Sequence, residues 1–387
     1  MTEKPRLGIV GFGAQGSVYA ELIADRAVTN MDLGAICDGD PAKRQLVESK
    51  YAVALYQDYV TMLDSGSVDA VVLTVPSYLH PQMGIDALQR GIHVLLEKPA
   101  GVYTKQVAEL NAVAATKPEL TFAIMFNQRN NPLYRKIKDI VSSGAIGQIR
   151  HTSWIITTWW RPQIYYDQAA WRGSWGGEGG GVLVNQAPHQ LDLWLWICGL
   201  PQSVYAKVAY GFRRAITVED EATAIVDYGQ GATGVFITAT HDLRGTDRFE
   251  ILGDSGKIVV DNSASATVTR LKEPERELSD AMDLEDMSKV LSGRLDLSGF
   301  YSSEAIESES HWGVQHAGML ENFAANILDG TPLIAPGAEG INSVRLANAI
   351  HLSSWTGREV PFEFDDDEYL AELNKRIREE NLFPERT

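Results

Sequence analysis

The sequence has few cysteines, no long apolar run and a shortage of positive charge. Its two cysteines, Cys37 and Cys198, lie in the apolar surroundings of an expected strand and an expected helix, so they indicate neither a disulfide framework nor a metal site. No apolar run approaches the ~20 residues that a membrane-spanning helix needs. The formal net charge of -17 argues against nucleic acids and anionic membranes as partners, because an acidic surface repels both.

The remaining composition is that of an ordinary globular protein. Hydrophobic residues make up 44% and charged residues 22% of the 387 positions, and this length suggests two domains. Residues 1–6 are polar and lead directly into an expected strand, so we expect no signal peptide and a cytoplasmic protein.

A glycine-rich stretch near the beginning of the chain carries most of the interpretation. An apolar strand pattern at residues 7–10 is followed by G-x-G-x-x-G and then by apolar residues at helical spacing. Gly11 allows the tight turn, Gly13 lets a pyrophosphate approach the backbone, and Gly16 lets the helix pack close to the strand. The phosphates would lie on the free N–H groups of the helix N-terminus. The alternative is a plain strand-turn-helix without a ligand.

An acidic residue follows the second expected strand. Residues 33–37 are apolar and end in Asp38, 22 residues after Gly16. A carboxylate there can accept hydrogen bonds from both hydroxyls of an adenosine ribose, which predicts a dinucleotide cofactor. We expect NAD rather than NADP, because Asp38 would repel a 2′-phosphate. Lys43 and Arg44 are the cations that could reverse this preference.

Short apolar strands alternate with helical patterns in the first third of the chain. This alternation predicts a doubly wound parallel sheet of the Rossmann type, with strands at residues 7–10, 33–37, 70–75, 93–97 and 121–125. Ligands bind at the carboxyl ends of such strands. We therefore expect the following residues to bind the cofactor: Gly11, Phe12, Gly13, Ala14, Gln15, Asp38, Thr74, Pro76, His80, Glu97, Lys98 and Asn127.

The pattern changes after about residue 147. Short strand candidates separated by tight turns predict an antiparallel sheet, at residues 149–158, 205–210, 222–228, 233–240, 248–252 and 257–260. A polar stretch at residues 272–299 is expected to be a mobile loop or excursion. Helical patterns follow at residues 316–328, 338–355 and 369–381. We divide the chain into a cofactor-binding domain, 1–126, and a substrate-binding and oligomerisation domain, 127–387, whose last helices could pack back on the first.

Two stretches carry candidate catalytic residues. Lys98 ends an expected strand just before Pro99, where it is either catalytic or a solvated lysine on a turn. Asn185 and His189 are four residues apart and share one face of an expected helix. A histidine there could take a proton near neutral pH. The alternatives are a helix N-cap for Asn185 and a core histidine for His189.

Between these stretches, residues 159–175 are rich in aromatic rings and arginine. Such clusters usually form a core or a subunit interface, but flat rings also match the C–H faces of a pyranose. On that reading Trp160, Tyr166 and Arg172 would bind the substrate. The expected substrate-binding set also includes Arg129, which follows the expected strand at 121–125, and Asn185. A weaker set of candidate functional residues is His311, Trp312, His316 and Glu321. Ligands at the usual spacing for a metal are lacking, so we predict no metal site.

Taken together, the motifs resemble the Gfo/Idh/MocA family of glucose–fructose oxidoreductases, inositol dehydrogenases and their relatives. The resemblance is carried by G-F-G-A-Q-G at 11–16, T-V-P-S-Y-L-H at 74–80, E-K-P at 97–99 and the glycine-to-histidine run at 179–192. It implies a Rossmann domain followed by an α/β domain with a large, mostly antiparallel sheet, whose outer face builds dimers and tetramers. It also implies oxidation of a ring secondary alcohol of a sugar or cyclitol with NAD or NADP.

The same resemblance implies residue roles. Lys98 would hydrogen-bond the reacting oxygen, and His189 would take the hydroxyl proton. Asn185 stands where many members carry aspartate, so it could bind the substrate but not accept a proton. Three functions stay open: an NAD-dependent dehydrogenase of a pyranose-type sugar, glycoside, anhydrosugar or cyclitol, an NAD-dependent glycosidase using transient oxidation, and a non-catalytic NAD-binding sensor. The expected partners are a small-molecule substrate and further copies of the chain, as a dimer or tetramer.

Overall fold

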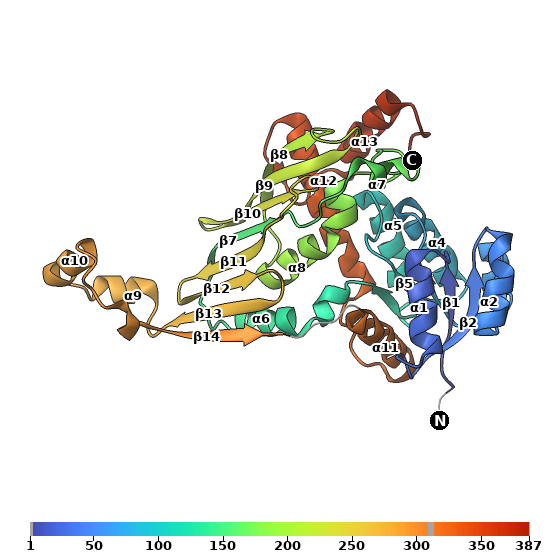
Figure 1. The fold of residues 1–387 in the computed structure, drawn as a ribbon, viewed down its shortest axis with the longest axis horizontal. Coiled ribbons are helices and arrows are strands. Elements are labelled where there is room, and N and C mark those ends of the chain that lie inside the picture. Colours follow the sequence, from blue (N-terminus) through green and yellow to red (C-terminus); the bar gives the residue numbers. More distant parts are fainter. Residues whose placement is uncertain (1–2, 309–312, 387) are drawn as a thin grey trace.

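The computed structural model describes residues 3–308 and 313–386, which form two β-sheets flanked by helices (Figure 1). The first sheet is parallel throughout, in the order β3-β2-β1-β4-β5-β6. Its strands are β1 (Arg6–Val10), β2 (Asp32–Cys37), β3 (Ala54–Tyr56), β4 (Ala70–Leu73), β5 (His93–Leu96) and β6 (Phe122–Ile124). Its accompanying helices are α1 (Ala14–Ala24), α2 (Arg44–Tyr51), α3 (Tyr59–Asp64), α4 (His80–Gln89) and α5 (Thr104–Ala115).

This is the expected doubly wound sheet. The five expected strands are present, and β3 was not predicted because it is only three residues long, with Leu55 alone buried. The strand order 3-2-1-4-5-6 is that of the dinucleotide-binding Rossmann fold, which places ligands at the carboxyl edge of the sheet.

The second sheet is large and mostly antiparallel, as expected. Its order is β14-β13-β12-β11-β7-β10-β9-β8-β15, and β7 and β10 are its parallel neighbours. The strands are β7 (Ile149–Ile156), β8 (Ser203–Tyr210), β9 (Glu219–Gly229), β10 (Ala232–Ala239), β11 (Asp247–Gly253), β12 (Gly256–Asp261), β13 (Ser265–Leu271), β14 (Tyr301–Glu307) and β15 (Val360–Pro361).

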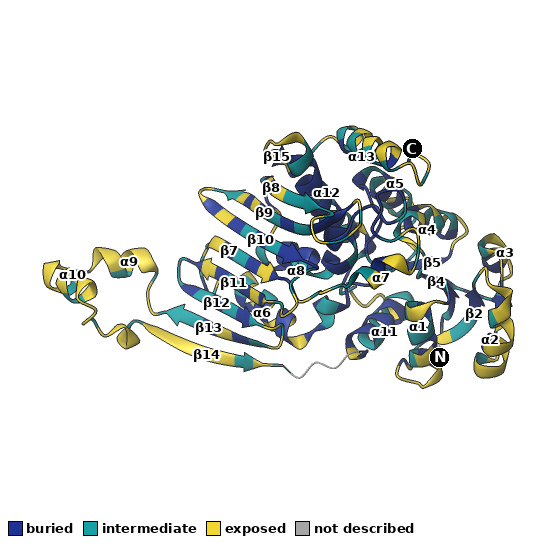
Figure 2. Ribbon diagram, turned by 45° about the horizontal axis from the view of Figure 1, so that its top comes forward, coloured by how far each residue is buried: buried dark blue, intermediate teal, exposed yellow. Residues whose placement is uncertain are grey.

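Helices cover one face of this sheet and leave the other open (Figure 2). The packed face joins a core with α6 (Pro132–Ser142), α8 (Pro188–Cys198), α12 (Gly340–Thr356) and α13 (Asp366–Glu380). On the open face, Tyr205, Ile225 and Ile155 are exposed. Across residues 3–308 and 313–386, no helix is long and apolar enough to cross a membrane.

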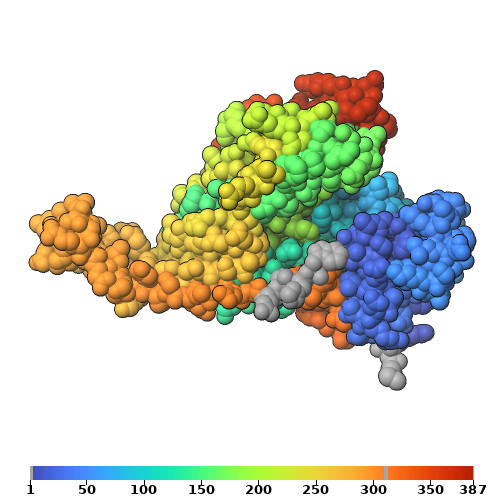
Figure 3. Space-filling model, viewed as in Figure 1, coloured from blue at the N-terminus to red at the C-terminus, as the bar shows by residue number. Residues whose placement is uncertain are grey.

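Between β13 and β14 the chain forms an arm that stands away from the body (Figures 1 and 3). The expected loop at residues 272–299 contains two short helices, α9 (Glu275–Asp280) and α10 (Leu284–Leu291). Apolar side chains such as Leu284 and Leu291 are exposed on it.

The chain returns to the first sheet after completing most of the second. Met319 and Phe323 of α11 (Val314–Asp329) belong to the core of the first sheet. The backbone N–H of Ile124 in β6 donates to the carbonyl oxygen of Ala335 at 3.1 Å. The N-terminal core is therefore completed by residues from the C-terminal third, and the domain division at residue 126 stays a prediction.

Candidate active site

The loop between β1 and α1 has space for a pyrophosphate. Gly11 has a φ of +89°, and a Cβ there would lie 2.6 Å from the carbonyl oxygen of Thr74. A Cβ at Gly16 would lie 2.1 Å from the carbonyl oxygen of Gly11, whereas at Gly13 no atom would lie within 4 Å. The first N–H groups of a helix lack intrahelical partners, and Gly13 gives α1 no side-chain cap. The loop therefore fits the phosphates of NAD.

Asp38 lies at the end of β2 beside this loop. Its carboxylate accepts hydrogen bonds from the backbone N–H of Phe12 at 2.8 Å and of Asp40 at 2.9 Å, and from Lys43 Nζ at 2.8 Å. Burial disfavours the charge, but these bonds outweigh it and lower the pKa of Asp38. The Phe12 ring is buried against Tyr51, so Phe12 acts on this site through its backbone.

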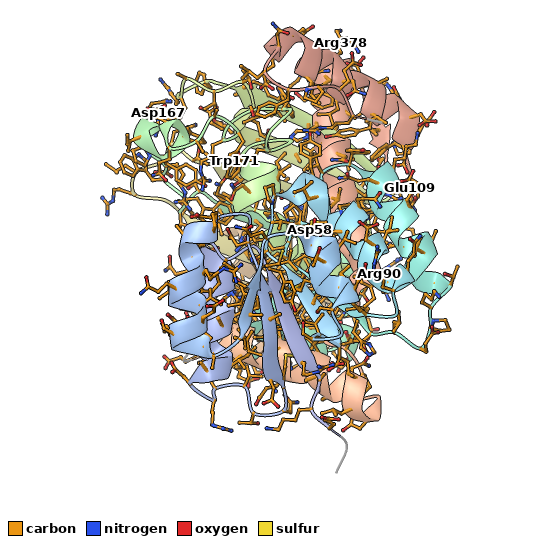
Figure 4. All side chains as sticks on the ribbon, turned by 90° about the vertical axis from the view of Figure 1, so that its right-hand side faces the viewer. Asp58, Arg90, Glu109, Asp167, Trp171 and Arg378 are labelled. Carbon is orange, nitrogen blue, oxygen red and sulfur yellow. The ribbon has the colours of Figure 1, made fainter. Side chains whose placement is uncertain are left out.

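A cavity of about 530 Å³ lies between the parallel-sheet part of the chain and the segment 165–185. The parallel-sheet part lines it with Ala14, Gln15, Thr74, Pro76, His80, Glu97 and Lys98, and the segment with Tyr165, Trp171, Arg172, Glu178 and Asn185. Figure 4 shows Trp171 where the blue N-terminal elements meet the green ones. Expected cofactor and substrate residues thus face one space.

Lys98 also lines a second cavity, of about 450 Å³. His189 lines this second cavity as well. The other lining residues include Gln15, Glu97, Asn127 and His316. Lys98 Nζ donates a hydrogen bond to the backbone carbonyl oxygen of Asn185 at 3.0 Å. Asn185 belongs to the turn Val182–Gln186, and His189 to the first turn of α8, so one short segment delivers both to the site.

The charges around Lys98 favour a neutral His189. Burial lowers the pKa of His189 well below its usual value, and the charges of Lys98 and His316 add to this effect. Burial also lowers the pKa of Lys98, while the carboxylates of Glu97 and Glu178 oppose that shift. Nδ1 of His189 is buried and has no hydrogen-bond partner among the described residues.

Several expected cofactor residues also hold the strand ends in place. His80 Nδ1 lies 2.8 Å from the carbonyl oxygen of Pro99, and its Nε2 lies 2.9 Å from that of Val75. Burial lowers the pKa of His80 to about 4, so the ring is neutral and its single N–H serves one of these two contacts. Glu97 accepts hydrogen bonds from the Tyr19 hydroxyl and the Lys98 backbone N–H.

Three expected substrate residues do not line either cavity. The buried guanidinium of Arg129 donates to Asp192 at 2.9 and 2.6 Å and to Glu339, which makes it a structural ion pair. Tyr166 is buried with its hydroxyl on Thr240 Oγ1 at 3.2 Å.

Trp160 is the third expected substrate residue that lines neither cavity, and it is exposed on the surface. Within α7 (Gln163–Asp167), successive side chains point in different directions, so Tyr165 lines the cavity and Tyr166 does not. The substrate assignments of Arg129, Trp160 and Tyr166 are therefore not supported.

Glu178 lines the first cavity and was not predicted. Only 6% of it is exposed, and its carboxylate accepts hydrogen bonds from the Gly173 backbone N–H at 2.8 Å and from Asn185 Nδ2. In the sequence it is one acid within a glycine run, which would be interpreted as a solvated turn. Its burial depends on contacts that sequence spacing does not reveal.

The weaker set of residues separates in the structure. His316 lines the second cavity, whereas Glu321 accepts hydrogen bonds from Thr29 and Asn30. His311 and Trp312 lie outside the described residues. In the part of the chain that the structure describes, no three His, Cys, Asp or Glu side chains converge as metal ligands.

Comparison with models of protein families identifies the family of the chain. The oxidoreductase family with an NAD-binding Rossmann fold matches residues 5–125, and the GFO/IDH/MocA C-terminal domain matches residues 134–259. The chain belongs to the Gfo/Idh/MocA family. This confirms the resemblance seen in the motifs and makes the protein an NAD-binding oxidoreductase.

Individual Gfo/Idh/MocA relatives are named for inositols and sugars. The scyllo-inositol 2-dehydrogenase (NADP(+)) IolW of Bacillus subtilis is 25% identical over 363 residues, which is 92% of this chain and 96% of that one. The WlbA dehydrogenase from Bordetella pertussis, solved with NADH and UDP-GlcNAcA, is 27% identical with a TM-score of 0.75, over 94% of this chain and 100% of that one.

Levoglucosan dehydrogenase in complex with NADH and levoglucosan shares the fold. Its TM-score is 0.77 at 18% identity, and the match covers 93% of this chain and 100% of that one.

Proposed function

We propose that this Gfo/Idh/MocA protein oxidises a ring secondary hydroxyl of a pyranose-type sugar, glycoside, anhydrosugar or cyclitol, with NAD as the acceptor. The observation that carries this proposal is that Lys98 lines both cavities and shares the second with His189. A polyhydroxylated ring bound there would meet an ammonium group and a neutral imidazole. The names of the relatives given above agree with such a substrate.

The two side chains have complementary tasks. Bound NAD supplies the hydride acceptor. His189 accepts the hydroxyl proton, because its lowered pKa keeps the ring unprotonated near neutral pH. The Lys98 ammonium stabilises the negative charge that develops on the substrate oxygen. Asn185 binds a neighbouring hydroxyl, since an amide cannot serve as the base.

The mouth of the first cavity suits a sugar ring. The Arg172 guanidinium lies 4.5 Å from the centroids of both the Tyr165 and Trp171 rings and donates to the Tyr165 hydroxyl at 2.7 Å. This stack offers flat apolar faces for C–H groups together with hydrogen-bonding groups for hydroxyls. Trp175, by contrast, is buried in the second core, so only part of the aromatic segment faces the cavity.

Steady-state kinetics test this proposal. Sugars, glycosides, anhydrosugars and cyclitols are screened by NADH formation, and His189→Ala and Lys98→Ala are compared with the wild type on the best substrate. Each variant should lower kcat by at least about a hundredfold, because His189→Ala removes a positioned proton acceptor and Lys98→Ala removes a group that stabilises the developing negative charge. NAD binding, followed by fluorescence, should change little. His151→Ala and Lys50→Ala are matched controls, because neither side chain lines the first or the second cavity.

Three outcomes would contradict this function. A near wild-type kcat for His189→Ala would exclude His189 as the base and make Tyr165 the next candidate. Sugar cleavage without accumulation of NADH would indicate the NAD-dependent glycosidase. Tight NAD binding without turnover of any compound would indicate the sensor.

We also propose that the protein is a homo-oligomer. The open face of the second sheet exposes Tyr205, Ile225 and Ile155, and burial of such a face between copies would remove apolar surface from water. Light scattering at micromolar concentration should report a dimer or tetramer, and a monomer would contradict the proposal.

A further inference from the structure

The polar groups around Glu178 form a hydrogen-bond network at the first cavity. One carboxylate oxygen, Oε2, accepts from the Gly173 backbone N–H at 2.8 Å, and Oε1 accepts from Asn185 Nδ2. Asn185 Nδ2 also lies 3.4 Å from the Tyr165 hydroxyl oxygen, which accepts from Arg172. A buried carboxylate is costly without such donors, and here both of its oxygens have one.

These contacts orient the Asn185 amide. An amide nitrogen carries two hydrogens, and Glu178 and Tyr165 provide an acceptor for each. Its carbonyl oxygen is then the group that remains for a ligand in the cavity. Asn185 therefore offers an acceptor, which a substrate hydroxyl can satisfy by donating its hydrogen.

Glu178 also contributes to the charge around Lys98. Titratable side chains from several elements face the Lys98 ammonium: Glu97 after β5, Glu178, His80 of α4, His189 of α8 and His316 of α11. The two carboxylates raise the pKa of Lys98 against the effect of burial. Burial raises the pKa of Glu178 itself, while Arg172 lowers it and Glu219 raises it further.

We propose that Glu178 is a positioning residue for the oxidation, which fixes Asn185 as the acceptor of a substrate hydroxyl and places a carboxylate in the same cavity as the Lys98 ammonium. This inference rests on the proposed function. The Asn185 acceptor would favour binding of substrates that carry a hydroxyl beside the oxidised carbon over analogues in which that hydroxyl is replaced by hydrogen.

The decisive variant is Glu178→Gln. Gly173 and Asn185 donate to different oxygens of the carboxylate, so a glutamine in the same place would present its oxygen to one donor and its NH₂ group to the other. The KM for the ring substrate should rise about tenfold, the effect of losing roughly 1.4 kcal/mol of binding. Lys98 should also lose its proton at lower pH, so the basic limb of the kcat/KM profile should move down by about one pH unit.

Two further variants separate this role from a general structural effect. Glu178→Gln combined with Asn185→Asp returns a carboxylate to the cavity and should move the basic limb back toward the wild-type position. Glu221→Gln, a control that pairs with His241 and does not line the cavity, should change neither KM nor the limb. An unchanged KM and an unchanged limb in Glu178→Gln would overturn the proposal.

The proposal stays testable if the first variant does not fold or if the protein oxidises no ring compound. Glu178→Ala removes the carboxylate without leaving an amide in its place and should lower the pH at which Lys98 titrates. That titration is read directly by NMR of ¹³C-labelled lysine, with the Lys98 signal assigned from its loss in Lys98→Arg. A Lys98 titration that is the same in the wild type and in each folded variant, Glu178→Gln or Glu178→Ala, would overturn the charge role without reference to turnover.

Discussion

Two glycine-rich stretches lie next to residues that line the site, but they differ in what surrounds them. At Gly13 in the first stretch, an added Cβ would meet no atom within 4 Å. At Gly179 and Gly181 in the second stretch, it would lie 2.0 Å from Val102 Cγ1 and 2.0 Å from the carbonyl oxygen of Glu219. The first stretch therefore leaves room for a ligand, whereas the second is filled by the protein itself.

The comparison shows why glycine motifs alone are ambiguous. Three consecutive glycines at 179–181 indicate a backbone that either a ligand or another strand approaches closely. In the structure it is a strand that approaches Gly181, because Glu219 belongs to β9. The packed glycines bring the turn at Val182–Gln186 against the sheet. This contact fixes the direction in which Asn185 and His189 enter the cavities.

The largest expected effect is that of Gly181→Ala. The neighbouring atom is a backbone carbonyl oxygen within a sheet, which cannot move aside as a flexible side chain would. Overpacking of this kind costs about 1–3 kcal/mol or more, so the thermal unfolding midpoint should fall by roughly 5 °C or more. Calorimetry measures the shift, and an unchanged midpoint would show that the second stretch is open like the first.

Gly13→Ala should have a smaller and different effect. Because the added methyl group meets no protein atom, the unfolding midpoint should stay within about 1 °C of the wild type. The methyl group would instead occupy space needed by the pyrophosphate, so we expect the Kd for NAD to rise at least about tenfold. Fluorescence titration with NADH measures this. A variant that loses stability but keeps its affinity would reverse the comparison between the two stretches.

The smallest expected effect concerns the choice of cofactor at Asp38, which lies at the end of β2 beside the first stretch. The wild type should prefer NAD over NADP in kcat/KM, because the Asp38 carboxylate repels a 2′-phosphate. Asp38→Ser removes this charge and frees Lys43, so the preference should shift toward NADP by about tenfold. Lys43→Ala is the matched variant and should sharpen the preference for NAD. A wild type that prefers NADP would mean that Lys43 outweighs Asp38 despite their 2.8 Å ion pair.

The parts of the site that could be predicted follow from local patterns. Strand, glycine turn and helix come from residues adjacent in sequence, and so do Lys98 at a strand end and His189 one helical turn after Asn185. Tyr166 was assigned to the substrate as one ring of an aromatic segment, and Arg129 because it follows the carboxyl end of a strand; neither pattern shows the direction of the side chain. Arg129 is instead satisfied by Asp192 and by the distant Glu339, a partner that no local pattern reveals.

The fold shows the same limit. Long apolar strands were recognised, whereas β13 and β14 were missed because their alternating residues are mostly polar, as in Ser265–Leu271 and Tyr301–Glu307. The stretch at residues 272–299 was expected to be a mobile loop or an excursion; it is an excursion, but its helices α9 and α10 were not predicted because the polar sequence shows no clear apolar periodicity.

The return of α11 and Ala335 to the first sheet has a consequence for synthesis of the protein. A nascent chain that has emerged as far as β6 still lacks Met319, Phe323 and the backbone partner of Ile124, so its apolar edge faces water. The cofactor-binding sheet then becomes complete only after more than half of the remaining chain has been translated. Chaperone capture during this interval, and poor expression of a fragment that ends after β6, would be the cellular signs of this order of assembly.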